Sequence, residues 1–223
     1  MNSTKGAPRA FCAAKNNFWK SDMSNFRSFT LYVVRHGECQ HNLEDWVASH
    51  DDSPLTPQGR AQAHEKGHLL KDLASPLDEL LFYSSPLHRA CVTMELMREQ
   101  AGLPHTGYRA DHRLMEMHTG DHIGRKWSEI PEHHHMAFRA DPWNAFRPGG
   151  ESQAMVHARI GRFLASIKHH AVIVTHGVTA RMIRGHYLGL APEQMLEYEM
   201  PNAGLLRLSG GSETYFKSHA RHA

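Results

Sequence analysis

The sequence predicts an α/β fold: a three-layer sandwich in which helices cover both faces of a mainly parallel central sheet, with a short cap insertion. Two continuously apolar runs, at residues 31–34 and 171–174, are typical of strands buried on both faces. Segments with helix start signals alternate with the predicted strands, which favours parallel pairing. No repeat or linker divides the chain internally, so we expect one domain over residues 26–215.

The first half of the domain is predicted from apolar runs and turn residues. The first strand covers residues 30–34, and a proline-marked loop then leads into a helix over residues 58–73. The stretch "LDELLFYSS" predicts a second strand that ends near Ser84. We expect Pro86 to occupy the first position of the next helix, which runs to about Gln100.

The second half contains the predicted cap, at approximately residues 112–150. A short third strand is expected just before it, within "HTGYRADHRL". The cap is rich in His, Trp, Pro and Gly and only weakly periodic, and we expect one helix in it, at about residues 126–138. The remaining elements are a helix within "GGESQAMVHARIGRFLASIK", the strand at 171–175, a helix within "VTARMIRGHYLG" and a last strand within "AGLLRLS".

The bulk composition is that of an ordinary soluble globular protein, with 40% hydrophobic and 22% charged residues. A net charge of +2 gives no reason to expect nucleic acid or an anionic membrane as a partner. No apolar run approaches the roughly 20 residues of a membrane span. The three cysteines lack CxxC spacing, so we expect a reducing compartment and neither a disulfide framework nor a zinc ribbon.

The two ends of the chain are expected to lie outside the domain. Residues 1–21 contain four basic residues, no acidic residue and no apolar core of a secretory signal. We therefore predict a disordered extension over residues 1–25 and a frayed tail over residues 216–223. The predicted location is cytoplasmic, with a mitochondrial presequence as the alternative interpretation of the basic, acid-poor start.

Two predicted strands end in the same way, with a histidine followed by a glycine. His36 and Gly37 come after the first strand, and His176 and Gly177 come after the strand at 171–175. Ligands of open α/β sheets bind outside the carboxyl ends of strands. Each glycine lets backbone N–H groups approach a ligand, and the helix start that follows favours an anion. We therefore predict that Gly37 and Gly177 contact the substrate.

Two arginines are expected at the same edge of the sheet. Arg35 is the last residue before His36, and Arg89 lies in the first turn of the helix that follows the second strand. Two guanidiniums suit a bidentate grip on phosphate oxygens. Two histidines beside two arginines would be electrostatically costly without an anion between them, so we expect a phosphoryl group as the ligand.

A histidine in such a site can do chemistry as well as bind. Its neutral ring nitrogen can attack phosphorus and form a covalent phosphoenzyme, and the arginine pair lowers its pKa by like-charge repulsion. The second histidine can donate to the phosphoryl oxygens during transfer. The leaving alkoxide needs a proton, and Glu116, on a loop followed by Gly120 and Gly124, is the best candidate acid. General acid catalysis contributes roughly 10²- to 10⁴-fold.

Six stretches of the chain carry a family resemblance in their order and spacing. They are "VVRHGECQHN", "LTPQGRAQA", "YSSPLHRA", "LMEMHTGDHIG", "PGGES" and "VTHGVTARMI". Together they resemble the histidine phosphatase superfamily, in its phosphoglycerate-mutase-like branch. Glu116 matches the proton donor of that family.

The resemblance implies further roles for individual residues. It implies that His36 is the phosphorylated nucleophile and that His176 is the second histidine of the pocket. It also implies that Arg35 and Arg89 bind phosphate and that Asn42 closes the pocket. Asn42 has a structural alternative, because asparagine often caps a helix.

Departures from the family pattern favour a phosphatase over a mutase. Cys39 stands where the family usually has Thr or Ser, and His41 stands where mutases often carry Trp. Val178 stands where mutases typically show Asn, and the cap is short. We predict a metal-independent, acid-type phosphomonoester hydrolase, with phosphoglycerate-mutase-type phosphotransfer as the alternative. Cys39 is expected to act as a small packing residue, with oxidation sensitivity as a minor alternative.

We expect no cofactor, because guanidiniums neutralise the charge that Mg²⁺ neutralises elsewhere. The expected partner is a small-molecule phosphomonoester rather than nucleic acid or a membrane. Exposed cap aromatics would also suit a homodimer. A non-catalytic phosphate-binding protein is a further alternative, but it predicts the loss of a catalytic residue, and none is evidently lost.

The stretch "HEKGH" has the H-E-x-x-H pattern of zinc proteases and gives a rival enzyme class. Such an enzyme needs both histidines, here His64 and His68, to face a cleft with a third ligand. At about 100° per residue they fall opposite the apolar side of the helix, with Gln, Lys and Glu nearby, so we expect the pair to face solvent. The apolar side is formed by Ala63, Gly67, Leu70 and Leu73.

The stretch "EHHHM" in the cap invites a metal interpretation as well. Consecutive helical residues point about 100° apart, so three histidines in a row cannot all face one ion. We expect a polar cap surface instead. Four aromatic residues are expected to pack the cap or line the substrate entrance: Trp127, Phe138, Trp143 and Phe146.

Overall fold

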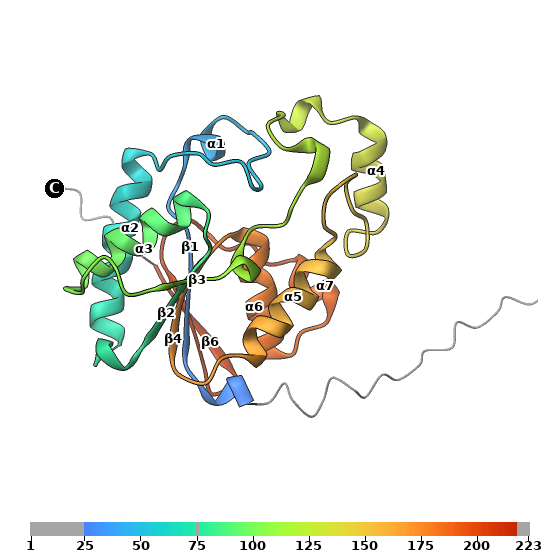
Figure 1. The fold of residues 1–223 in the computed structure, drawn as a ribbon. Helices are drawn as coiled ribbons and strands as arrows, with labels where there is room; N and C mark the ends of the chain where they lie inside the picture. Colours follow the sequence, from blue (N-terminus) through green and yellow to red (C-terminus); the bar gives the residue numbers. More distant parts are fainter. Residues whose placement is uncertain (1–24, 75, 218–223) are drawn as a thin grey trace, which may run out of the picture.

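The computed structural model describes residues 25–74 and 76–217, and all but the last residue of the predicted N-terminal extension and most of the predicted tail lie outside these residues. Within them the strands form one six-stranded sheet in the order β3-β2-β4-β1-β5-β6 (Figure 1). Neighbours among β3, β2, β4 and β1 pair in parallel, whereas β5 and β6 are antiparallel. This confirms the predicted α/β fold with a mainly parallel sheet. The strands are β1 (Leu31–Arg35), β2 (Leu81–Ser84), β3 (Arg109–Ala110), β4 (Ala171–Thr175), β5 (Leu205–Ser209) and β6 (Ser212–Phe216).

Helices cover both faces of this sheet and produce the three layers visible in Figure 1. One face carries α2 (Pro57–Leu73) and α3 (His88–Gln100), and the other carries α5 (Gln153–Ala165) and α6 (Gly177–Leu188). Three α-helices are shorter: α1 (Gln40–Leu43), α4 (Glu132–Ala140) and α7 (Pro192–Leu196). The helices α1 and α4 lie outside these layers, whereas α7 packs beside α6, and its Met195 enters the same core. Short 3₁₀ turns complete the described part: η2 (Asn25–Ser28), η3 (Leu77–Glu79), η4 (His112–Leu114), η5 (Gly120–His122) and η6 (Trp127–Glu129).

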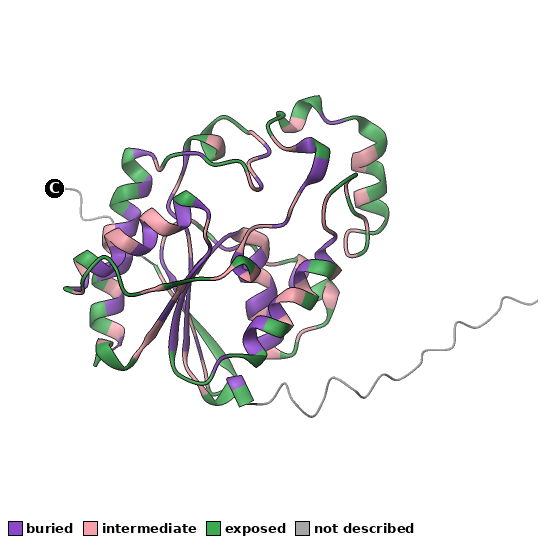
Figure 2. Cartoon of the chain, in the orientation of Figure 1, coloured by how far each residue is buried: buried purple, intermediate pink, exposed green. Residues whose placement is uncertain are grey.

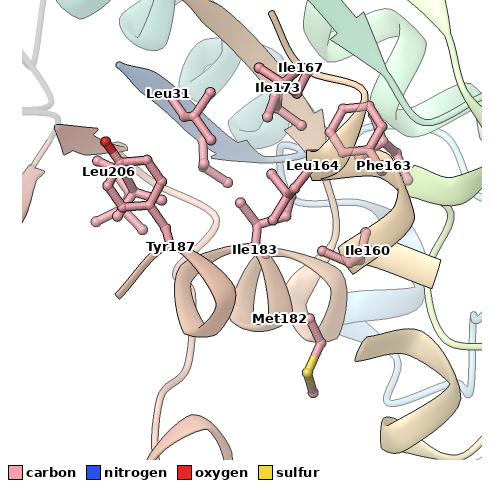
Figure 3. Close-up of a cluster of buried hydrophobic side chains, with 14 of the residues drawn as sticks. Leu31, Ile160, Phe163, Leu164, Ile167, Ile173, Met182, Ile183, Tyr187 and Leu206 are labelled. Atoms are coloured by element: carbon pink, nitrogen blue, oxygen red, sulfur yellow. The ribbon is translucent and has the colours of Figure 1, made fainter. Parts of the chain in front are cut away.

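The central strands alternate between two hydrophobic cores because successive side chains of a strand point to opposite faces. In β1, Leu31 and Val33 enter the core beneath α5 and α6, and Tyr32 and Val34 enter the core beneath α2 and α3. Figure 2 shows the resulting buried sheet between partly exposed helices, and Figure 3 shows Ile160 of α5 and Ile183 of α6 in the first of these cores. Burial on both faces explains the continuously apolar runs in the sequence.

The register of the sheet brings three strand ends level. Arg35 at the end of β1 pairs with Thr175 at the end of β4, and Ser84 at the end of β2 pairs with Val174. The ladder continues by one residue after β1, since the N–H of His36 donates to the carbonyl of Thr175 at 2.9 Å. The residues that follow β1, β2 and β4 therefore meet at one edge of the sheet.

Four details differ from the sequence prediction. Pro86 lies before the N-cap of α3, which begins at His88, rather than at the first helical position. The cap helix α4 begins at Glu132, because residues 127–129 form a separate 3₁₀ turn and Pro131 then serves as the N-cap. A further strand, β6, was missed: Gly210 and Gly211, both with positive φ, turn the chain back beside β5. Consequently Phe216, assigned to the frayed tail, is the last residue of β6 in an ordered hairpin.

Glycine at position 59 is required by a close approach between backbones. Gly59 lies in the first turn of α2, whose N-cap Thr56 accepts a hydrogen bond from its N–H at 2.9 Å. A Cβ atom on Gly59 would lie 1.9 Å from the carbonyl oxygen of Glu38, and one on Gly37 would lie 2.2 Å from the carbonyl oxygen of Gly59. The N-terminus of α2 thus packs directly on the loop that follows His36.

We expect Gly59→Ala to destabilise the protein by roughly 1–3 kcal/mol, because backbone must move to make room. The better helix propensity of alanine is worth only about 1 kcal/mol and does not compensate. Urea unfolding measures this loss. Gln58→Ala, at the exposed neighbouring position, is the matched control and should change stability by less than about 0.5 kcal/mol. Equal stabilities of the Gly59 variant and the wild type would contradict the close packing.

Candidate active site

His36 occupies the end of β1 with its ring buried and only 4% of the residue exposed. Its Nδ1 lies 2.7 Å from the carbonyl oxygen of Gly37. A carbonyl can only accept, so Nδ1 carries the proton and Nε2 keeps a free lone pair. Burial, followed by the charges of Arg89 and Arg35, holds the pKa of His36 well below its usual value of 6.5. The ring is therefore neutral near pH 7, which is the nucleophilic form.

His176, at the end of β4, is fully buried beside His36, with 5.1 Å between the two ring centres. Its Nε2 lies 2.7 Å from the hydroxyl oxygen of Ser85, which also accepts a hydrogen bond from the N–H of Leu87. This arrangement favours donation from Ser85 to Nε2 and places the ring proton on Nδ1, a buried atom with no partner among the described residues. Burial and then Arg89 lower the pKa of His176.

Arg89 lies in the first turn of α3 and is only 2% exposed. Its two terminal nitrogens donate to the carbonyl oxygens of Asp51 at 2.9 Å and Ser49 at 2.6 Å. The carboxylate of Asp52 lies 3.6 Å away and is half-exposed. These contacts fix the guanidinium in place, while Nε has no partner within the described part of the chain. The sequence predicts Arg89 at this site, but no pattern in it indicates the loop carbonyls that hold the guanidinium.

Arg35 is the last residue of β1 and directly precedes His36. One terminal nitrogen donates to the carbonyl oxygen of Met200 at 2.9 Å, and its buried Nε has no partner among residues 25–74 and 76–217. A Cβ atom on Gly177 would lie 3.6 Å from the guanidinium carbon of Arg35 and 3.7 Å from a carboxylate oxygen of Glu116. Gly177, at the start of α6, therefore lies between these two predicted site residues.

Glu116 is held by backbone donors on a loop that faces the strand ends. Its Oε1 accepts from the N–H of Met117 at 2.8 Å, and its Oε2 accepts from the N–H of Val178 at 3.2 Å. Its own carbonyl oxygen accepts from the ring of His50 and from the guanidinium of Arg159. Each carboxylate oxygen keeps a further lone pair that can hold a proton.

Asn42 takes part in helix capping and also lines the cavity. Its Oδ1 accepts from the N–H of Cys39 at 3.1 Å and caps the short helix α1. The residue also lines the cavity above His36. Cys39 is fully buried at this N-cap, in agreement with the expected packing role.

These groups open into a cavity of about 500 Å³ beneath the cap. Figure 1 shows α1 and α4 on the side of the sheet toward which β1 runs. His36, Asn42, Arg89 and Glu116 line the cavity, whereas His176 lies behind them against His36. The five predicted catalytic residues, His36, His176, Glu116, Arg35 and Arg89, are thus gathered at one place.

The fold and motif order match a known family. A family model described as histidine phosphatase superfamily (branch 1) matches residues 31–219. The chain belongs to the histidine phosphatase superfamily. Among curated relatives, a 2,3-bisphosphoglycerate-dependent phosphoglycerate mutase of Brucella melitensis is 33% identical over 192 residues, which cover 80% of this chain and 90% of that protein.

Several solved structures share the fold. A putative alpha-ribazole-5'-P phosphatase from Escherichia coli superposes with a TM-score of 0.73 at 23% identity. The superposition covers 87% of this chain and 97% of the phosphatase. YhfR of Bacillus stearothermophilus superposes with a TM-score of 0.69 at 27% identity, covering 85% and 96%. At these identities the likeness establishes the architecture, and the chemistry has to be argued from the site.

The rival motif of a zinc protease lies on α2 of this histidine phosphatase fold. His68 is exposed and His64 is half-buried, and neither lines the cavity. Within the described segments, no three His, Cys, Asp or Glu side chains are grouped to hold a metal ion, and no helix is long and apolar enough to cross a membrane.

One detail of the prediction for helix α2 was wrong: Gln62 and Lys66 are buried rather than on the solvent side.

Lys66 is a buried cation beneath the candidate site that sequence analysis missed. Its ammonium donates to the carbonyl oxygen of Arg35 at 2.8 Å. Burial, followed by the charge of Arg35, lowers the pKa of Lys66 from 10.5 to about 7. The sequence pattern of the helix does not indicate this contact, because a lysine that lies among polar residues is usually exposed to solvent.

Replacing Lys66 with methionine is expected to flatten the pH dependence of stability above pH 7. Between a native pKa of about 7 and an unfolded value near 10.5, only the unfolded chain holds the extra proton. The free energy of unfolding of the wild type therefore rises with pH in this window, by up to about 1.4 kcal/mol per unit. Below pH 7 both states are protonated and the full cost of the buried charge remains.

Urea unfolding at pH 7 and pH 9 measures this difference between the wild type and Lys66→Met. The matched control is Lys71→Met on the exposed side of the same helix, and it should keep the slope of the wild type. Identical slopes for Lys66→Met and the wild type would show that Lys66 does not release its proton on folding.

Proposed function

We propose that this histidine phosphatase superfamily member is a metal-independent phosphomonoester hydrolase that works through a phosphohistidine on His36. The observation that carries the proposal is the buried ring of His36, whose Nδ1 is bonded to the Gly37 carbonyl, so that the Nε2 lone pair is left free. Arg35 and Arg89 lie close enough to lower its pKa. A neutral nucleophile beside two guanidiniums suits attack on a phosphoryl dianion.

In the first step, the Nε2 lone pair of His36 forms a bond to phosphorus while the bond from phosphorus to the alcohol oxygen breaks. The electron pair goes to that oxygen, and protonated Glu116 supplies its proton. The phosphorylated ring gains positive charge, which the bond from Nδ1–H to the Gly37 carbonyl stabilises. Arg35, Arg89 and the Nδ1–H of His176 bind the phosphoryl oxygens.

In the second step, water attacks phosphorus and Glu116, now a carboxylate, accepts its proton. The bond between phosphorus and nitrogen breaks, and its electron pair returns to Nε2. Inorganic phosphate leaves and His36 regains its neutral form. The two steps together return the charges of the site to their starting values, so the cycle balances without a metal or redox partner.

Phosphoglycerate-mutase-type phosphotransfer is the second candidate, because the 33%-identical curated relatives carry that name. A mutase would pass the phosphoryl group from His36 to a second hydroxyl instead of to water. Hydrolysis is preferred here because Cys39, His41 and Val178 depart from the residues that mutases typically carry.

The test is a panel of phosphomonoesters in which free phosphate is measured beside phosphoryl movement between carbons. Phosphoglycerates are included so that both activities are visible in one assay. We expect free phosphate to be released from several members of the panel without added metal. Isomerisation of phosphoglycerate with no phosphate release would support the mutase instead.

A further inference from the structure

The cap end of the cavity differs chemically from the end that holds His36. A cavity of about 500 Å³ is the size of sites that enclose whole small molecules, so a phosphoryl group fills only part of it. Residues 119–147 supply the cap wall, and none of their lining side chains is acidic. Three of them carry phenyl or indole rings: Trp127, Phe138 and Phe146.

Arg147 is the cation of this wall. Its guanidinium carbon lies 5.3 Å from the ring centre of Trp127 and 5.0 Å from that of Phe138. These rings orient the guanidinium and shield it from water. One terminal nitrogen is buried with no hydrogen-bond partner in the described part of the chain. A buried charged donor without an acceptor is costly, and an anionic group of a ligand would satisfy it.

Phe146 is the flat apolar surface beside that cation. It lines the cavity although 68% of the residue is exposed, so its ring is not covered by the protein core. Ile130, Ala137 and Ala145 add small apolar surface to the same wall. An aromatic ring of a ligand can stack on Phe146, which is worth more than simple contact area.

The histidines of this wall do not favour a metal ion. His122 Nε2 and His134 Nδ1 are 2.7 Å apart, a hydrogen-bond distance, so the N–H of one ring donates to the lone pair of the other. A metal ion would need the lone pairs of both nitrogens. Of the three consecutive cap histidines, His133 is exposed, whereas His134 and His135 are half-buried and line the cavity.

We propose that the cap wall is a second subsite for the alcohol part of the substrate, which presents an aromatic or heteroaromatic ring to Phe146 and an anionic group to Arg147. This inference rests on the proposed function, since it places the phosphoryl group of the same molecule at His36. It defines the substrate class as aromatic phosphomonoesters with a second negative charge.

The experiment compares kcat/KM for phenyl phosphate, 4-carboxyphenyl phosphate and ethyl phosphate in the wild type and in Arg147→Met. The wild type should prefer 4-carboxyphenyl phosphate over phenyl phosphate by about 10- to 100-fold, the range of one charge-assisted hydrogen bond. The preference should fall to nearly one in Arg147→Met and be partly kept in Arg147→Lys. Arg139→Met removes an exposed cap arginine and should keep the preference of the wild type.

The ring contact is tested by Phe146→Ala, which should reduce the preference for phenyl over ethyl phosphate several-fold. Met136→Ala is the matched control, since Met136 is an exposed apolar residue of α4 outside the cavity. Equal use of the two aromatic esters by the wild type, or a preference kept by Arg147→Met, would overturn the subsite.

Calorimetric binding separates this inference from the proposed function. If no ester releases phosphate, the hydrolase proposal fails, but the subsite still predicts that the wild type binds 4-carboxyphenyl phosphate more tightly than phenyl phosphate and that Arg147→Met does not. If esters are hydrolysed and both aromatic compounds bind equally, the subsite alone fails.

Discussion

Replacing His36 with alanine is expected to lower phosphatase turnover by about 10⁴-fold or more, because no nitrogen remains to carry the phosphoryl group. The fold should survive, since the side chain makes one hydrogen bond, to the Gly37 carbonyl, beside an existing cavity. We expect the free energy of unfolding to fall by only about 1 kcal/mol. Steady-state assays and urea unfolding measure the two quantities.

Labelling separates loss of the nucleophile from loss of binding. A radiolabelled phosphomonoester, quenched within one turnover, should leave acid-labile label on the wild type and none on His36→Ala. His68→Ala, at an exposed position of α2, is the matched control and should behave as the wild type. Label on His176 in the His36 variant, or normal turnover by that variant, would show that the assigned nucleophile is wrong.

Glu116→Gln is expected to have the second largest effect, and the effect should depend on the leaving group. With an alkyl phosphate, the first step should slow by roughly 10²- to 10⁴-fold, because the alkoxide leaves without its proton. With 4-nitrophenyl phosphate that step needs little protonation, so it should slow by less than about tenfold. Phosphoenzyme should then accumulate, because Glu116 also activates water. Stopped-flow measurement would show a burst of nitrophenolate close to one per site.

Glu99→Gln, at an exposed position near the end of α3, is the matched control and should show neither change. Both carboxylate oxygens of Glu116 accept hydrogen bonds from backbone N–H groups, and the amide of Glu116→Gln keeps only one such oxygen. A melting curve of the variant is therefore needed to exclude a displaced loop. Equal slowing with both leaving groups in a variant of normal stability would argue that Glu116 positions substrate and donates no proton.

Strong local signals made most of the fold predictable. The strands at Leu31–Arg35 and Ala171–Thr175 are apolar almost throughout because both faces are covered, and Thr56 and Ser152 cap the helices α2 and α5. The strand β6 escaped prediction because "SETYF" lies at the sheet edge and is largely exposed, so it carries no apolar pattern. The position of β6 is set by its pairing with β5, and the residues of β6 carry no pattern from which that pairing could be predicted.

The sequence by itself determined which chemical groups end the strands: His36 after β1, His176 after β4 and Arg89 after β2, because a histidine or arginine beside a buried apolar run is visible in the chain itself. Only the tertiary structure decided the protonation, orientation and burial of those groups and of their neighbours. The Gly37 carbonyl selects the nitrogen of His36 that carries the proton, Ser85 orients His176, and Lys66 is drawn into the interior. These contacts depend on distances of a few ångströms between segments that are far apart in the sequence. Burial in the packed fold then lowers the pKa values of His36, His176 and Lys66, and a local sequence pattern contains no information on that burial.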